Sequence, residues 1–244
     1  MIVAAEYTSQ GGRKINEDSC GVIIQDHRAC AVVADGLGGH GGGDIASSTA
    51  VDVVCESWRA TALVDRSDID SWFQEINEKI YEMQTDTCAM KTTLAVMTCE
   101  RGKAILAHVG DTRIYHFVDG KLYTVTFDHS VSQMAVLAGE ITQEQIRHHV
   151  DRNKLLRALG RDDEVQVEIS NPIDITENTH AFLLCTDGFW EYVLEKEMEE
   201  LLVQAAHPDE WLDGMVELLK SRVPDGNDNN TAVAVWMIDE VDRL

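Results

Sequence analysis

A series of short apolar runs rich in β-branched residues fills this sequence, and several are separated by only a few residues of turn type. Two such links are Glu100-Arg101-Gly102 and Asp119-Gly120. Links this short join antiparallel neighbours, because parallel strands need a crossover of about a dozen residues or more. The predicted strands cover residues 20–25, 29–34, 92–100, 103–110, 112–118, 121–126, 165–169, 180–186 and 231–238.

Helical spacing of apolar residues occurs in separate blocks between these runs. Residues 44–59 and 68–84 repeat apolar side chains three and four positions apart, and Pro208 marks the first turn of a further helix. No repeat, linker or shift in composition divides the chain. We therefore predict a single α+β domain over residues 1–244, with two sheets and helices outside them.

Region 127–160 interrupts the strand pattern. Two short helices are predicted there, one of them opened by a capping box between Thr142 and Gln145. We interpret this region as a flap-like insertion, because insertions of this size tend to line or cover functional sites.

The charge balance excludes some partners. Twenty Lys and Arg residues against 43 Asp and Glu residues leave a net charge of −23 at pH 7. Such a chain repels nucleic acid and anionic lipid, so neither is a predicted partner. The acidity is explained either by a soluble acidic surface or by carboxylates reserved for divalent cations.

The cysteines and the N-terminus indicate a cytoplasmic protein. The six cysteines are scattered, without the Cys/His spacing of a zinc site, and are interpreted as reduced core residues. The N-terminus lacks the pattern of a signal peptide, and no apolar run approaches the roughly eighteen residues of a membrane span. We expect a cytoplasmic monomer with no membrane contact.

Acidic residues recur where predicted strands begin or end. Any one of them alone is typical of a turn former that hydrogen-bonds its own backbone. If the strand ends converge, however, carboxylates within about 4 Å of one another repel by several kcal/mol unless a cation neutralises them. Hard ions such as Mg²⁺ and Mn²⁺ prefer these oxygen ligands. The residues concerned are Asp35 before Gly36, Asp111 before Thr112, Asp187 before Gly188, the pair Glu17-Asp18, and Asp228.

Arg13 has two interpretations. It lies five residues before Asp18, in an otherwise acidic neighbourhood. A salt bridge to Glu17 or Asp18 is one interpretation, and two-pronged binding of a phosphate group is the other. Combined with a two-metal centre, the second interpretation indicates phosphoester hydrolysis.

The glycine-rich segment 35–43 offers an alternative function. Gly36, Gly38 and Gly41 match the spacing of a dinucleotide-binding loop after a strand and before a helix, which would indicate an oxidoreductase. Against this, Asp35 would face the pyrophosphate, and the chain lacks the alternating strands and helices of a parallel sheet.

Several motifs in order resemble a known family. They are R-x-x-N-E-D from Arg13, V-x-A-D-G-L-G-G-H-x-G-G, T-T-L, H-V-G-D-T-R-I-Y, D-H-S, L-x-R-A-L-G, C-T-D-G-F-W and D-N-N-T. Their order and spacing, from about residue 6 to 238, resemble the bacterial metal-dependent serine/threonine protein phosphatases of the PPM or type 2C family. One departure is Lys91, which stands where the family has glycine before the two threonines.

The resemblance implies a four-layer α-β-β-α sandwich, two antiparallel sheets with helices on both outer faces, and a Mn²⁺ or Mg²⁺ centre of two or three ions at one end. A water bridging two ions would attack phosphoserine or phosphothreonine on proteins directly, opposing a serine/threonine kinase. The implied roles are Asp35 bridging both ions, the Gly36 carbonyl on the second, Asp187 and Asp228 on the first, Glu17 and Asp18 on the second directly or through water, Asp111 on a third, and Arg13 on phosphate.

The histidines and tryptophans divide into several groups. His40 is either a general acid, as in some members of the family, or a loop histidine bonded to a carbonyl. We expect His129, His148 and His149 on the solvated flap surface, and Trp190, Trp211 and Trp236 in the core. A catalytically weak phosphoprotein-binding regulator is a further alternative, but none of the implied ligands is missing.

Overall fold

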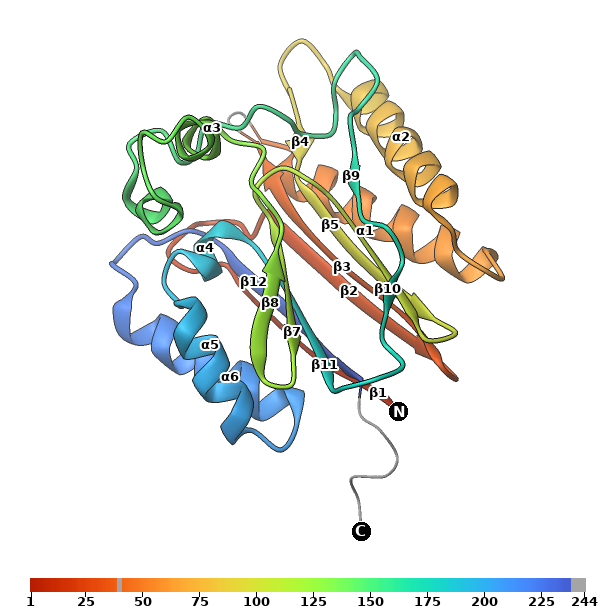
Figure 1. Ribbon diagram of the computed structural model, residues 1–244. Coiled ribbons are helices and arrows are strands. Elements are labelled where there is room, and N and C mark those ends of the chain that lie inside the picture. Colours follow the sequence, from red (N-terminus) through yellow and green to blue (C-terminus); the bar gives the residue numbers. More distant parts are fainter. Residues whose placement is uncertain (39–40, 238–244) are drawn as a thin grey trace.

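Two antiparallel sheets stacked face to face form the centre of the computed structural model, which describes residues 1–38 and 41–237 (Figure 1). The first sheet has the order β1 (Ile2–Ser9), β12 (Asn230–Met237), β11 (His180–Cys185), β7 (Arg113–Val118) and β8 (Lys121–Val125). The second has the order β10 (Ile173–Asp174), β6 (Lys103–Val109), β5 (Leu94–Glu100), β3 (Arg28–Leu37) and β2 (Asp18–Gln25), with β4 (Lys91–Thr92) beside β3 and β9 (Glu168–Ile169) beside β6.

Helices cover both outer faces, as the resemblance implied. Helices α1 (Gly43–Ala60) and α2 (Arg66–Met83) pack on the second sheet, while α5 (Glu195–Gln204) and α6 (Pro208–Arg222) pack on the first. The short α4 (Asp187–Trp190) directly follows β11. Within the described ranges, no helix is long and apolar enough to cross a membrane. The predicted α-β-β-α sandwich is confirmed.

Three apolar layers hold the sandwich together. Phe182 and Leu184 of β11 meet Val33 of β3 and Met97 of β5 between the sheets, and all four are inaccessible to solvent. Separate clusters lie under each helical layer, where burial of apolar surface contributes about 25 cal/mol per Å². The expected core positions of Trp190, Trp211 and Trp236 are confirmed, with exposures of 2%, 0% and 9%.

Some elements differ from the sequence prediction. Strand β1 was not predicted, although it pairs with β12 along its whole length. Helix α5 was also missed, because its sequence is rich in glutamate and only Met198 is fully buried. Of the predicted strand 165–169, only Glu168–Ile169 pairs, with β6.

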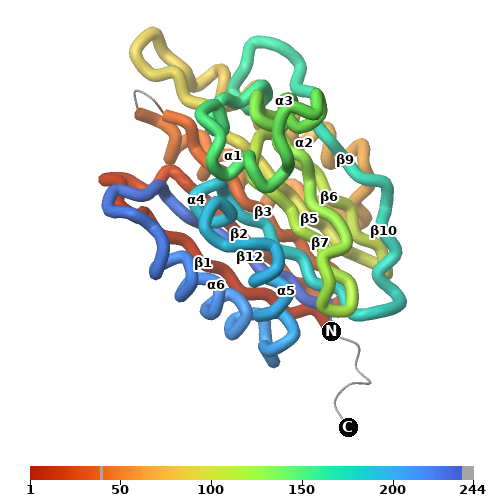
Figure 2. The backbone as a smooth tube through the Cα atoms, turned by 60° about the vertical axis from the view of Figure 1, so that its left-hand side comes forward, coloured from red at the N-terminus to blue at the C-terminus, as the bar shows by residue number. Residues whose placement is uncertain are grey.

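The predicted insertion forms two short helices. We call residues 127–160 the flap segment; it contains α3 (Val131–Leu137) and the 3₁₀ helix η1 (Gln143–His148). The predicted capping box is present, since the Thr142 amide donates to the Gln145 side chain at 2.7 Å. In Figure 2 this green segment lies above α4.

One prediction about the flap segment is wrong. His129 was expected on the solvated surface, but it is 9% exposed and accepts a hydrogen bond from the Gly110 amide at its Nδ1 atom, 3.1 Å away. The tertiary contact, invisible in a polar stretch of sequence, outweighs the residue's preference for water. His148 is exposed as expected, and His149 is partly exposed.

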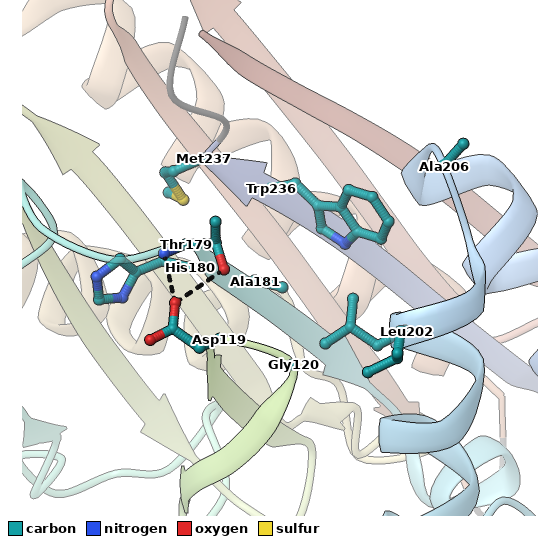
Figure 3. Close-up of a pocket in the computed structure, with 10 residues that line it drawn as sticks. Asp119, Gly120, Thr179, His180, Ala181, Leu202, Ala206, Trp236 and Met237 are labelled. Carbon is teal, nitrogen blue, oxygen red and sulfur yellow. Dashed lines mark hydrogen bonds between the residues drawn. The ribbon is translucent and has the colours of Figure 1, made fainter. Parts of the chain in front are cut away.

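A cavity of about 330 Å³ lies at the far end of the first sheet, between the end of β12 and helix α5 (Figure 3). Its wall contains Trp236, Leu202 and Ala181, and Asp119 accepts a hydrogen bond from the Thr179 amide at 3.0 Å. Because β12 begins near Asp228 and ends here, this cavity is separated from the acidic strand ends by the length of the sheet.

Candidate metal centre

The acidic strand ends converge at one end of the sandwich. Asp18 begins β2 and lies opposite Asp35 in the register with β3. Asp111 follows β6, Asp187 opens α4 just after β11, and Asp228 precedes β12. In antiparallel sheets one strand ends where its neighbour begins, so these residues from both sheets lie at the same end of the sandwich.

They surround a cavity of about 350 Å³. Among the predicted site residues, the cavity is lined by Arg13, Glu17, Asp35, Gly36, Asp111, Asp187 and Asp228. Asp18 is buried and does not line the cavity. The structure therefore brings together every predicted residue except His40, which lies outside the described residues.

Burial and mutual repulsion disfavour ionised carboxyls at this site. Desolvation raises the pKa of Asp18 and of Asp187 to about 7. Desolvation, followed by the charges of Asp18 and Asp187, raises the pKa of Asp35 well above its usual range. Asp111 is affected in the same way by burial and by Asp187. A cation bound here would favour the ionised carboxyls and would compete with protons for the site.

Arg13 is the one cationic side chain among the described residues that line the cavity. Its Nη2 atom lies 2.7 Å from Asp228 Oδ2, and the two side chains are 54% and 40% exposed. The salt-bridge interpretation named Glu17 or Asp18 as partner, whereas the structure pairs Arg13 with Asp228. An exposed pair of this kind is weak, on the order of 0–1 kcal/mol, and among the described residues Arg13 forms no ion pair with Asp18, Asp35, Asp111 or Asp187.

Threonines fix the backbone at Asp35. The Asp35 amide donates to Thr93 Oγ1 at 3.0 Å, and its carbonyl accepts from the Thr93 amide at 2.8 Å and from Thr92 Oγ1 at 2.9 Å. Lys91, the departure from the family pattern, is exposed in β4 opposite Leu37. The lysine side chain therefore leaves the contacts of Asp35 intact.

Asp18 and Glu17 occupy different environments. Thr186 Oγ1 donates to Asp18 Oδ2 at 3.0 Å, so one oxygen of this buried carboxyl already has a partner. The Glu17 carbonyl accepts from the Gly36 amide at 3.1 Å. This bond ties the Glu17 loop to the end of β3.

Asn229 was missed by the sequence analysis. Its Oδ1 atom accepts from the Glu17 amide at 2.8 Å, and its Nδ2 atom donates to the carbonyls of Gln10 and Ile15 at 2.8 and 3.0 Å. It thereby fastens the loop of Arg13 and Glu17 beside Asp228. Its position in D-N-N-T was the available signal.

Gly36 and Gly38 are required for close packing. A Cβ atom on Gly36 would lie 2.1 Å from the Gly43 carbonyl oxygen, and one on Gly38 would lie 2.5 Å from Glu17 Oε1. The strand before this segment, β3, is antiparallel to both β2 and β5. The dinucleotide-binding alternative is therefore wrong, because that site requires a parallel βαβ unit.

Comparisons with known proteins agree with this geometry. The family model described as Protein phosphatase 2C matches residues 9–224. The chain belongs to the protein phosphatase 2C family. The expected enzyme class, a metal-dependent protein phosphatase, is confirmed with it.

Relatives match over nearly the whole chain. The serine/threonine phosphatase stp of Listeria welshimeri is 36% identical over 95% of this chain and 94% of its own length. Stp1 from Staphylococcus aureus superposes with a TM-score of 0.87 and 26% identity, covering 98% of this chain and 96% of that one. The catalytic domain of PstP, in complex with two manganese ions, has a TM-score of 0.82 and 27% identity, covering 98% and 99%.

The raised pKa values predict how pH affects the stability of the chelated protein. A carboxyl whose folded pKa lies near 7 keeps a proton that the unfolded chain releases near pH 4, so its stabilising contribution is lost as pH rises between these values. The melting temperature of the chelated protein should fall from about pH 5 to about pH 8, and Mn²⁺ should restore it at the higher pH.

Asp35→Asn tests the origin of this effect. The chelated variant should be more stable than the chelated wild type at about pH 8, because it removes a carboxylate whose charge is disfavoured by desolvation and by neighbouring charges. Asp70→Asn, on the exposed face of α2, is the matched control and should behave as wild type. A flat pH profile for the chelated wild type would contradict the repulsion.

Proposed function

We propose that this phosphatase hydrolyses phosphoserine and phosphothreonine on proteins with two Mn²⁺ or Mg²⁺ ions bound at the acidic cavity. The observation that carries the proposal is the convergence of four aspartates on a cavity whose one lining cation, within the described chain, reaches only Asp228. When bound, such ions would lower the pKa of a water molecule for attack on phosphorus and would neutralise the phosphoryl oxygens.

The donor set fits hard divalent ions. Asp35 would bridge both ions, with the Gly36 carbonyl on the second, and Asp187 and Asp228 would hold the first. Glu17 lines the cavity and can serve the second ion directly. Asp18, buried and hydrogen-bonded to Thr186, is better placed to act through water.

Asp111 would serve a third, looser ion. It lines the same cavity but comes from the turn after β6, beside the flap segment. Its carboxyl is not needed to bridge the first two ions. We therefore assign it separately from the principal pair.

Arg13 would hold the phosphate group of the substrate. Its exposed guanidinium lines the cavity and, within the described part of the chain, is paired only with Asp228. A metal ion at Asp228 would free the guanidinium to hold two phosphoryl oxygens. The salt bridge and the phosphate interpretation would then describe two states of one side chain.

The cysteines do not offer a nucleophile. None lines the cavity, and burial raises the pKa of Cys20 and Cys99 to about 12, far from a reactive thiolate. All six are free thiols, which supports a reducing, cytoplasmic location. A serine/threonine kinase that phosphorylates the same substrates is the proposed opposing enzyme.

Residues 1–244 would act as one catalytic domain, with the flap segment beside the substrate. Asn153 and Leu155 of that segment line the cavity. The role of His40 as general acid stays a prediction from the sequence.

Activity should depend on the metal and on the principal aspartates. Hydrolysis of a phosphothreonine peptide should vanish in excess chelator and return with Mn²⁺. Asp35→Ala, Asp187→Ala and Asp228→Ala should each remove nearly all of it. A phosphoprotein-binding regulator would instead bind the peptide without turnover.

Asp111→Ala should leave the two principal ions in place and raise only the Mn²⁺ concentration needed for full activity. Calorimetric titration of the chelated variant with Mn²⁺ checks this. Loss of all Mn²⁺ binding would show that the ligand assignment is wrong.

Arg13→Ala should lower kcat/KM roughly ten- to a hundredfold by removing a charged hydrogen bond, and should weaken inhibition by phosphate. Mn²⁺ affinity should be unchanged or tighter, because the guanidinium no longer competes for Asp228. Arg13→Lys keeps the charge but loses the two-pronged geometry, so it should not restore kcat/KM.

Lys14→Ala, at the neighbouring exposed cation, is the matched control for Arg13 and should leave these constants near wild type. Wild-type phosphate inhibition in Arg13→Ala would remove Arg13 from the phosphate site.

A further inference from the structure

Three consecutive residues at the start of the flap segment contact the strand ends on either side of Asp111. The Phe127 carbonyl lies 2.9 Å from His108 Nε2. Asp128 accepts from Arg113 Nε and Nη2, both at 2.7 Å. The start of the flap segment therefore contacts the chain both before and after Asp111.

His129 makes a two-point contact with Gly110. Its backbone amide donates to the Gly110 carbonyl at 2.9 Å, and its Nδ1 atom accepts from the Gly110 amide at 3.1 Å. Gly110 has a φ of +106°, where a side chain would be strained and would collide with Thr93. The residue directly before Asp111 is thus held by His129 in a conformation that only glycine adopts readily.

The contacts of Arg113 continue to helix α4. The buried Arg113 guanidinium lies 3.5 Å from the centre of the Trp190 ring, and Trp190 Nε1 donates to the Asp111 carbonyl at 3.0 Å. Trp190 belongs to α4, which begins at Asp187. One chain of contacts therefore joins Asp128, Asp111 and the helix that carries Asp187.

His129 also fixes the returning end of the flap segment. The Leu156 amide donates to the His129 carbonyl at 2.8 Å, and the preceding residue, Leu155, lines the catalytic cavity. His129 is therefore the point where the turn of Asp111 and both ends of the flap segment meet.

A metal site at this cluster is a competing explanation, since ligand atoms of His108, His129 and Glu168 lie within 4.8 Å of one another. The hydrogen bonds oppose it. Because Nδ1 of His129 accepts from Gly110, the ring proton lies on Nε2, the atom that faces Glu168 at 3.4 Å. Arg157 Nη1 lies 3.3 Å from the same Nε2, where its charge would repel a metal ion.

We propose that Asp128 and His129 are positioning residues that hold Asp111 toward the cavity and couple the flap segment to the third metal site. The proposal rests on the proposed function, in which Asp111 binds that ion. His129 holds Gly110 at a φ of +106°, and Trp190 donates to the Asp111 carbonyl, so the backbone on both sides of the Asp111 side chain is fixed by these contacts.

Two substitutions of His129 separate positioning from packing. In His129→Asn, the side-chain oxygen can replace Nδ1 as acceptor for the Gly110 amide, whereas His129→Gln places its amide near the Nε2 position instead. His129→Gln should raise the Mn²⁺ concentration for half-maximal activity roughly tenfold, as for other residues that orient a metal ligand. At saturating Mn²⁺, kcat should stay close to wild type, and His129→Asn should recover most of the loss.

A double-mutant cycle tests whether His129 acts through Asp111. His129→Gln should have no further effect on Mn²⁺ dependence in an Asp111→Ala background. His148→Gln, the same change at an exposed flap histidine, is the control and should match wild type. Additive effects, or equal effects of His129→Asn and His129→Gln, would overturn the proposal.

A measurement on the wild type serves if a variant fails to fold. Titrating the chelated protein with Mn²⁺ should slow hydrogen exchange at the amides of Gly110–Arg113 and of His129 over the same Mn²⁺ range. Slowing at the first set without the second would overturn the coupling. If the wild type binds Mn²⁺ in this way but shows no phosphatase activity, the proposed function fails while the coupling stands.

Discussion

The crowding of carboxyls at one end of the sandwich, where desolvation and mutual repulsion disfavour their charge, is the constraint on which this structure depends. Asp18, Asp35, Asp111 and Asp187 all have raised pKa values, with burial as the largest cause and neighbouring charges adding to it. Among the described residues, the Arg13 side chain pairs only with Asp228, and it is 54% exposed. A divalent cation relieves the repulsion better than any side chain of the described cavity wall, so metal binding and stability of this end of the fold are linked.

The surrounding structure keeps the repelling groups in place. Thr92 and Thr93 fix the backbone of Asp35, and Asn229 fastens the loop of Glu17. These contacts are hydrogen bonds between neutral groups and backbone, so they do not neutralise the carboxylates. They hold the proposed ligands in place, which would reduce the ordering required when an ion binds. A backbone that is fixed by hydrogen bonds, while the carboxylate charges stay uncompensated, suits a site that binds a cation.

The convergence of the acidic residues could be predicted from the sequence because they stand at strand ends, and antiparallel strands bring such ends together. Asp35 and Asp187 follow apolar runs that are typical of strands, so their places at strand ends could be predicted. The burial of His129 and the partner of Arg13 could not be predicted, since both depend on contacts between segments far apart in the chain. Helix α5 was not predicted because Met198 is its one fully buried residue, which leaves little apolar periodicity in the sequence.

The central claim is that the acidic cavity holds divalent cations, and anomalous diffraction from a crystal grown with Mn²⁺ tests it most directly. The account predicts two strong Mn²⁺ peaks bridged by Asp35, one bounded by Asp187 and Asp228 and the other by the Gly36 carbonyl. A weaker third peak at Asp111 is also predicted. Strong peaks elsewhere with none between these aspartates would contradict the account.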